Sequence, residues 1–194
     1  EGYAINRRLI ENGEVQFVAN PNGLRDDVVT VITCRDAQSN EIRASLFHFT
    51  CHASLMNEYA ISADYPGEAR RYIEKELGNN AVAAYLPGCG GNIRANCTFI
   101  GGKLFRAGKR DDLAIFGEAL GKEVVRVAKE STSPITPELF EKSTAVELPF
   151  EHVPNKTELD EYLKSEEKIN QIWASKLLSE GLKPSATFYI KRID

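Results

Sequence analysis

Residues 61–87, ISADYPGEARRYIEKELGNNAVAAYLP, decide the fold class. Proline is favoured in a first helical turn, as at Pro66, and glycine commonly ends a helix, as at Gly78. Between them, apolar residues recur at helical spacing and predict one buried helix face: Ala69, Tyr72, Ile73 and Leu77. The apolar run over residues 81–86 is short and ends at a proline, which predicts a buried strand after the helix.

Two further strands are expected before this helix. Residues 28–34 are rich in β-branched side chains and predict a buried strand, and residues 42–50 predict another after a polar turn. The two strands should form an antiparallel hairpin. A strand, a helix and a strand in this order predict a βαβ unit, with a parallel strand pair and a right-handed crossover.

The rest of the chain is expected to add two helices and two strands. The first of these helices has apolar residues at helical spacing from Leu113 to Val127, and either Asp111 or Asp112 can cap it. A strand is expected over residues 144–150, and a last strand over residues 186–193. One long amphipathic helix over residues 155–180 should separate them, with Asn155 as its N-cap. We therefore expect a single α/β domain, with a mixed β-sheet, flanking helices, one βαβ unit and a long C-terminal amphipathic helix.

The composition of the 194 residues is that of an ordinary globular chain, with 42% hydrophobic and 27% charged residues. The 24 basic and 28 acidic residues give a net charge of −4, which argues against a nucleic-acid partner. No apolar run approaches the roughly 18 residues of a membrane span. The chain begins without methionine and ends inside a predicted strand, so we expect residues 1–194 to be an incomplete piece of a larger catalytic domain.

Histidines and cysteines are the first candidates for chemistry. On a strand, His48 and His52 would share a face, but four residues span about 13 Å, too far for one metal ion. Only His52 stands at the carboxyl end of that strand, where open α/β sheets bind ligands. We expect His48 to be a half-buried structural residue and His152 to lie on the surface.

The four cysteines form no CxxC pair, which argues against a zinc ribbon or a thioredoxin-type redox motif. Cys34 and Cys51 lie in apolar stretches and are expected to be buried free thiols. Cys89 and Cys97 flank a glycine-rich turn, where a disulfide would need their Cα atoms within about 7 Å of each other.

The glycine-rich loop GCGGN over residues 88–92 follows the strand of residues 81–86. It lacks both GxGxxG spacing and a Walker lysine, so nucleotide binding is not expected. Its glycines would let the backbone approach a substrate or direct N–H groups toward an oxyanion. By itself, Asp64 at the helix start predicts only a helix cap that interacts with the helix dipole.

Taken together, five short segments resemble the neutral/alkaline non-lysosomal ceramidase family, and in particular its bacterial ceramidase-like hydrolases. Their order and spacing match over roughly residues 3–130. The segments are NRR at residues 6–8, NPNG at 20–23, FTCHAS at 49–54, ISADYPG at 61–67 and AYLPGCGGNI at 84–93.

The resemblance implies a zinc-dependent hydrolase of an amide bond, of the N-acylsphingosine amidohydrolase type. It implies that two histidines, a glutamate and a tyrosine hold the metal, that His52 is the second histidine, and that the other ligands lie outside this chain. Alone, the chain would then be inactive. Arg7 matches an arginine that holds substrate, and Gly91 and Asn92 lie in the loop expected to bind substrate. Arg94 stands where the family carries a serine required for activity. Its guanidinium stays protonated and cannot act as a nucleophile, but it could clamp a carboxylate or polarise a carbonyl.

Two functions follow from these expectations. The first is a periplasmic or secreted zinc hydrolase of sphingolipid metabolism, acting on a small-molecule or lipid amide. The second, indicated by Arg94, is a catalytically dead ligand-binding module on the same fold.

Overall fold

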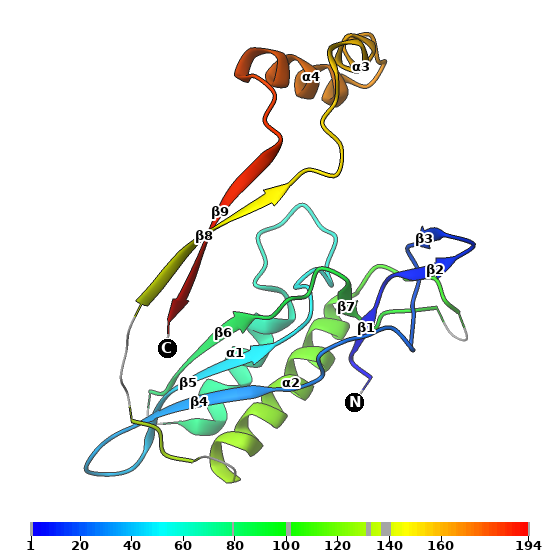
Figure 1. The fold of residues 1–194 in the computed structure, drawn as a ribbon. Helices are drawn as coiled ribbons and strands as arrows, with labels where there is room; N and C mark the ends of the chain where they lie inside the picture. Colours follow the sequence, from blue (N-terminus) through cyan, green and yellow to red (C-terminus); the bar gives the residue numbers. More distant parts are fainter. Residues whose placement is uncertain (1, 79, 100–101, 131–132, 137–140, 194) are drawn as a thin grey trace. The chain divides into compact units, whose positions relative to one another are not determined.

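The computed structural model describes residues 2–78, 80–99, 102–130, 133–136 and 141–193. Its internal contacts divide the chain into two compact units, Glu1–Pro134 and Ile135–Asp194 (Figure 1).

The first unit is built on a three-stranded sheet in the order β4-β5-β6 (Figure 1). Strand β4 (Thr30–Arg35) runs antiparallel to β5 (Ile42–Phe49), and β5 runs parallel to β6 (Val82–Pro87). Helix α1 (Asp64–Leu77) connects the parallel pair and ends at Gly78. This arrangement confirms the predicted hairpin, the βαβ unit and the α/β class.

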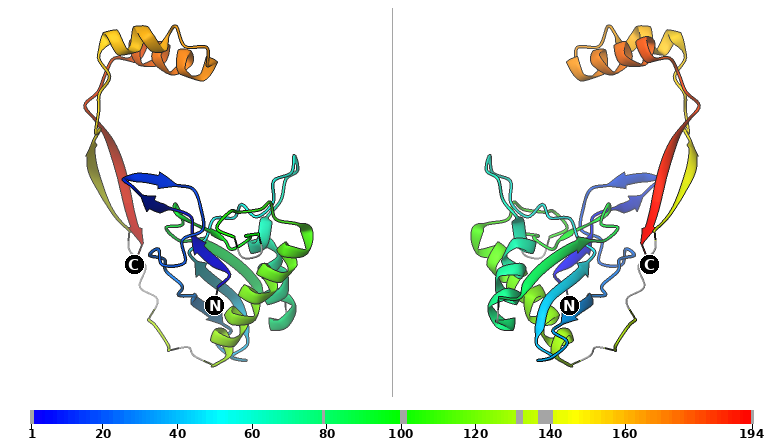
Figure 2. Two further views of the ribbon diagram at one scale, coloured as in Figure 1. Left: turned by 90° about the vertical axis from the view of Figure 1, so that its right-hand side faces the viewer. Right: turned by 90° about the vertical axis from the view of Figure 1, so that its left-hand side faces the viewer.

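Helices α1 and α2 (Arg110–Glu130) cover one face of this sheet, α1 against β6 and α2 against β4 (Figure 2). Glycines let the two helices approach closely. A Cβ atom on Gly117 would lie 2.8 Å from the Tyr65 carbonyl oxygen, and one on Gly121 would lie 2.9 Å from the Tyr72 ring. The core between helices and sheet includes Phe47, Tyr65, Ala69, Ile73, Ala83 and Val124.

The prediction that residues 28–34 and 81–86 form buried strands holds for one face of each strand only. Side chains alternate between the two faces of a strand, and the helices cover only one face of the described sheet. Ile32 is therefore 44% exposed and Val82 56% exposed, whereas Ala83 is buried against the helices.

Two pairs of short strands lie outside the main sheet. Strand β1 (Ala4–Asn6) pairs antiparallel with β7 (Ile93–Ala95), although about ninety residues separate them in the chain. Strands β2 (Leu9–Glu11) and β3 (Glu14–Gln16) form a hairpin.

The second unit contains the antiparallel pair β8 (Glu141–Pro149) and β9 (Ser185–Ile193), with helices α3 (Lys156–Tyr162) and α4 (Lys168–Glu180) in the connection. The prediction of a single long helix over residues 155–180 is therefore wrong.

The predicted N-cap of α3 is confirmed, because the Asn155 side chain accepts a hydrogen bond from the Glu158 N–H in a capping box. The break between the two helices lies at Ser165. Its hydroxyl accepts from the Glu167 N–H at 3.2 Å, and its carbonyl accepts from the Gln171 side chain at 2.7 Å. Serine side chains that bind nearby backbone groups in this way compete with helix continuation.

All four cysteines are free. Cys51 and Cys97 are buried and Cys89 is exposed, so the structure contains no Cys89–Cys97 bridge. Cys34 is also exposed, contrary to its prediction, because it lies on the uncovered face of β4. Among the described residues, no helix combines the length and apolar character that crossing a bilayer requires.

Candidate functional site

The pairing of β1 with β7 brings the predicted arginines together. Ile5 pairs with Arg94 and Asn6 with Ile93, and the Arg7 N–H extends the ladder by donating to the Asn92 carbonyl at 2.8 Å. Because side chains alternate along a strand, Arg7 and Arg94 project from the same face as diagonal neighbours. The opposite face is buried in the core through Ala4, Ile93 and Ala95.

His52 lies along the other edge of β7. It forms a parallel bridge with Arg94, and its N–H donates to the Ile93 carbonyl at 3.1 Å. Adjacent strands lie about 4.8 Å apart, so the exposed His52 emerges beside Arg94. Three residues from separate segments, Arg7, His52 and Arg94, thus gather on one surface.

Two phenylalanines support the guanidinium groups. The guanidinium carbon of Arg94 lies 4.4 Å from the centre of the Phe105 ring, and that of Arg7 lies 5.0 Å from the centre of Phe17. Arg8 also contacts Phe17, at 5.3 Å, and the two rings meet edge to face at 5.9 Å. Cation–π contacts of this kind hold planar guanidinium groups in place.

A pair of asparagines fixes the backbone beside these arginines. The buried Asn6 side chain accepts from the Arg8 N–H at 2.8 Å and donates to the Leu24 carbonyl at 2.8 Å. Asn20 donates through its side chain to the Arg8 carbonyl and through its backbone to Asn6, both at 2.8 Å. A Cβ atom on Gly23 would lie 2.5 Å from Asn6 Cγ, so the turn after Asn20 requires glycine.

The glycine-rich loop packs tightly against the end of β5. A Cβ atom on Gly88 would lie 2.1 Å from the Thr50 hydroxyl oxygen and 2.6 Å from the His48 ring. Gly91 and Asn92 are exposed, and their carbonyl oxygens accept from the Arg7 side chain at 2.9 Å and from its backbone N–H. The loop therefore orients Arg7.

The arginine surface carries uncompensated positive charge. Burial lowers the pKa of Arg7, and the neighbouring charges of Arg8 and Arg94 lower it further. The Nε atoms of Arg7 and Arg94 are both buried and have no hydrogen-bond partner. Within the described part of the chain, none of the three arginines forms an ion pair with a carboxylate.

The described residues do not form a complete metal site. They contain no group of three or more histidine, cysteine, aspartate or glutamate side chains placed to hold an ion, whereas a catalytic zinc usually has three protein ligands. Cys51 lies next to His52 in the chain, but burial raises the pKa of its thiol to about 12, so it stays protonated at neutral pH. His52 is thus the one predicted ligand among these residues.

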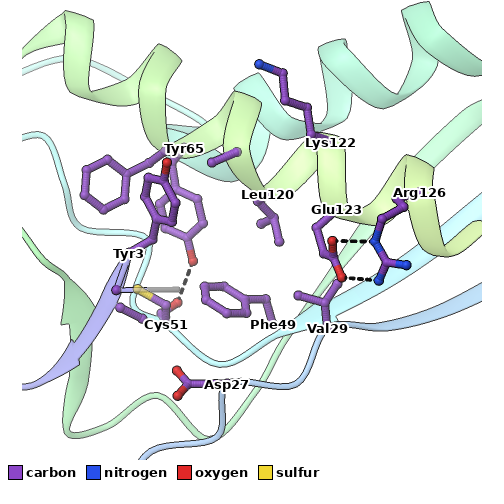
Figure 3. A pocket seen from close by; sticks show the side chains of 14 residues that line it. Tyr3, Asp27, Val29, Phe49, Cys51, Tyr65, Leu120, Lys122, Glu123 and Arg126 are labelled. Carbon is purple, nitrogen blue, oxygen red and sulfur yellow. Dashed lines mark hydrogen bonds and ion pairs between the residues drawn. The ribbon is translucent and has the colours of Figure 1, made fainter.

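A cavity of about 490 Å³ lies on the core side of β1. Figure 3 shows Tyr3, Phe49 and Tyr65 around it, with the Glu123–Arg126 ion pair at one end. The Tyr65 hydroxyl donates to the Cys51 carbonyl at 2.9 Å, and burial raises the tyrosine's pKa. The cavity can accept an apolar group, but the protonated Cys51 thiol makes a poor nucleophile.

The other two histidines lie where we expected them. His48 is half-buried, and His152 is exposed and lies 3.1 Å from Glu158. No sequence pattern indicated a role for Phe17 and Phe105. They stand far apart in the chain and belong to no motif, so only the spatial proximity of their segments identifies them. The NRR and NPNG segments did contain a signal for Asn6 and Asn20.

Comparison with known proteins supports the fold. No family model matches the chain, and no curated protein matches it. A structure of neutral ceramidase from Pseudomonas aeruginosa matches 75% of the chain, with 19% sequence identity and a TM-score of 0.56. A ceramidase complexed with C2 also matches 75% of the chain, with 20% identity and a TM-score of 0.58. The chain spans about a quarter of the length of these proteins, covering 24% and 23% of them respectively.

Proposed function

We propose that this chain supplies part of the active site of a ceramidase-like hydrolase that cleaves an amide bond. The observation that carries the proposal is the convergence of His52, Arg94 and Arg7 on one surface. This surface lies at the carboxyl end of a parallel strand pair, where α/β sheets usually bind ligands. The fold shared with the two ceramidase structures supports the same reaction class.

Zinc belongs to this proposal as the metal that His52 would help to hold. The exposure of His52 supports this role, and further ligands would have to come from outside the described residues. Bound zinc in hydrolases supplies an activated water and polarises the carbonyl group. Arg7, positioned by the Gly91 and Asn92 carbonyls, would orient the substrate. The family resemblance adds a periplasmic or secreted location to the proposal.

The test measures zinc content and amide hydrolysis in the complete gene product that contains this chain. About one zinc per chain is expected, together with release of fatty acid from N-acyl amides. His52→Ala should lose metal and activity together, whereas His152→Ala, which changes an exposed histidine of the second unit, should lose neither. Full activity of the His52→Ala protein would contradict the assignment of His52 as a ligand.

A ligand-binding module without catalysis is the second candidate, and Arg94 is the observation that favours it. A guanidinium held over Phe105, on a residue whose backbone bridges to His52, can bind a ligand, but it cannot attack one. A complete gene product that binds an N-acyl ligand but neither retains zinc nor hydrolyses amides would support this second function.

A further inference from the structure

We propose that Arg7 and Arg94 together form a binding site for an oxyanion, so that the ligand of this surface carries a carboxylate or phosphate group. The inference deepens the proposed function, on which it rests for the amide part of the ligand. A neutral amide would leave the charges of this site without a counterion.

The register of the two short strands gives the site its geometry. Ile5 is paired with Arg94 and Arg7 is opposite Asn92, so the two arginines are diagonal neighbours on one face of the ladder. Diagonal Cβ atoms lie roughly 7–8 Å apart or less, within reach of long side chains. Two guanidinium groups on such a diagonal can approach one anion from both sides.

The donors of this site are formed and partly desolvated. The Nε atoms of Arg7 and Arg94 are buried and bind no protein group, although most buried polar atoms in proteins have a partner. One Nη of Arg7 already donates to the Gly91 carbonyl, and the Phe17 and Phe105 rings hold the planes of the two guanidiniums. Both guanidinium groups thus keep donors that no protein group satisfies, and guanidinium groups suit bidentate binding of carboxylate or phosphate.

The electrostatics point to the same ligand. Arg8 and Arg94 repel the charge of Arg7, and like charges on adjacent strands destabilise a sheet. No carboxylate among the described residues pairs with these arginines, although acidic residues outnumber basic ones in the chain. A bound anion would relieve the repulsion between these charges.

Binding of small anions to the 194-residue chain tests the inference without requiring metal or turnover. Isothermal titration at low salt would compare N-acetylglycine, which carries an amide and a carboxylate, with the neutral N-acetylglycinamide. We expect the anion to bind at least about 10-fold more tightly, the order of one charge-assisted hydrogen bond. Arg94→Gln and Arg7→Gln should each abolish this preference, and Arg94→Lys should restore part of it.

The control is Arg71→Gln, which removes an exposed arginine of α1 and should leave binding unchanged. Circular dichroism of each variant would establish that it is folded. Competition by inorganic phosphate would show that any oxyanion is accepted, whereas binding of N-acetylglycine without such competition would identify a carboxylate site. Equal binding of the two amides, or an unchanged preference in folded Arg94→Gln, would overturn the inference. A failure of zinc binding or hydrolysis in the complete protein would contradict the proposed function but not this result.

Discussion

Replacing Asp64 by asparagine tests what holds the segment that follows His52. Asp64 is the first residue of α1 and is buried, and one of its carboxylate oxygens accepts from the N–H groups of Leu55 and Met56, both at 3.0 Å. The other oxygen accepts from the Tyr65 N–H at 2.8 Å. The carboxylate therefore fixes the loop after His52 to the start of the helix, in addition to any interaction with the helix dipole.

The magnitude follows from these three hydrogen bonds. Asparagine matches aspartate in size and tolerates the positive φ of 53° at this position, so the backbone should not change. The single side-chain carbonyl oxygen of asparagine cannot accept from both the Leu55–Met56 N–H groups and the Tyr65 N–H. The NH₂ group of asparagine would then face at least one N–H donor. Losing one hydrogen bond to a charged group costs about 1.5–3 kcal/mol, whereas an interaction with the helix dipole alone contributes about 0.3–1 kcal/mol.

We therefore expect Asp64→Asn to lower the free energy of unfolding by about 2 kcal/mol, which for a unit of this size corresponds to roughly 6–8 °C in Tm. Urea and thermal unfolding followed by helical circular dichroism would measure it. Asp111→Asn, at an exposed position in the first turn of α2, is the matched control and should show only the dipole effect. Equal losses of less than about 1 kcal/mol in both variants would refute the reasoning.

Three further predictions concern the rest of the first unit. The ion pair with Arg106 lowers the pKa of Asp112 from 3.8 to about 2. The stability that this pair provides is therefore present above pH 4 and is lost as the pH falls toward 2. After allowance for solvent screening, Asp112→Asn should lower the free energy of unfolding by roughly 1–2 kcal/mol at pH 7, and urea unfolding should then depend less on pH in the acid range. The thiol of Cys51, buried and with a pKa of about 12, should react with Ellman's reagent far more slowly than the exposed cysteines, and a rapid reaction of four thiols in the folded chain would contradict its burial. Gly88→Ala should destabilise the fold by about 1–3 kcal/mol in thermal unfolding because its Cβ atom would overlap a buried hydroxyl, whereas the added Cβ of Gly91→Ala meets no atom within 4 Å and should have little effect on stability.

Local sequence patterns were sufficient to predict the βαβ unit of the fold. The spacing of Ala69, Ile73 and Leu77, with Gly78 at the end, predicted α1, and the apolar run that follows predicted β6. Both features depend on residues close together in the chain, as does the capping box at Asn155. The prediction of one long helix over residues 155–180 was wrong for a local reason too. The apolar periodicity continues through Ser165, but the Ser165 side chain binds a nearby backbone N–H and competes with helix continuation.

Burial could not be predicted in the same way. The sequence of a short apolar strand does not indicate whether one or both of its faces are covered. In the structure, α1 and α2 lie on one face of the sheet and leave Ile32 and Val82 exposed on the other. Which face is covered depends on how the helices pack, including the close approach that Gly117 permits.

For the candidate site, too, the sequence and the tertiary structure contributed different information. The sequence by itself determined which residues were candidates for chemistry. His52 was indicated by its place at a strand end, and Arg7 and Arg94 by motifs that resemble those of the ceramidase family. Only the tertiary structure decided that they share one surface. Three-residue strands such as β1 and β7 carry too little pattern to predict their pairing across some ninety residues. The Nε atoms of Arg7 and Arg94 are buried without hydrogen-bond partners, a property that arises only when distant segments exclude water together.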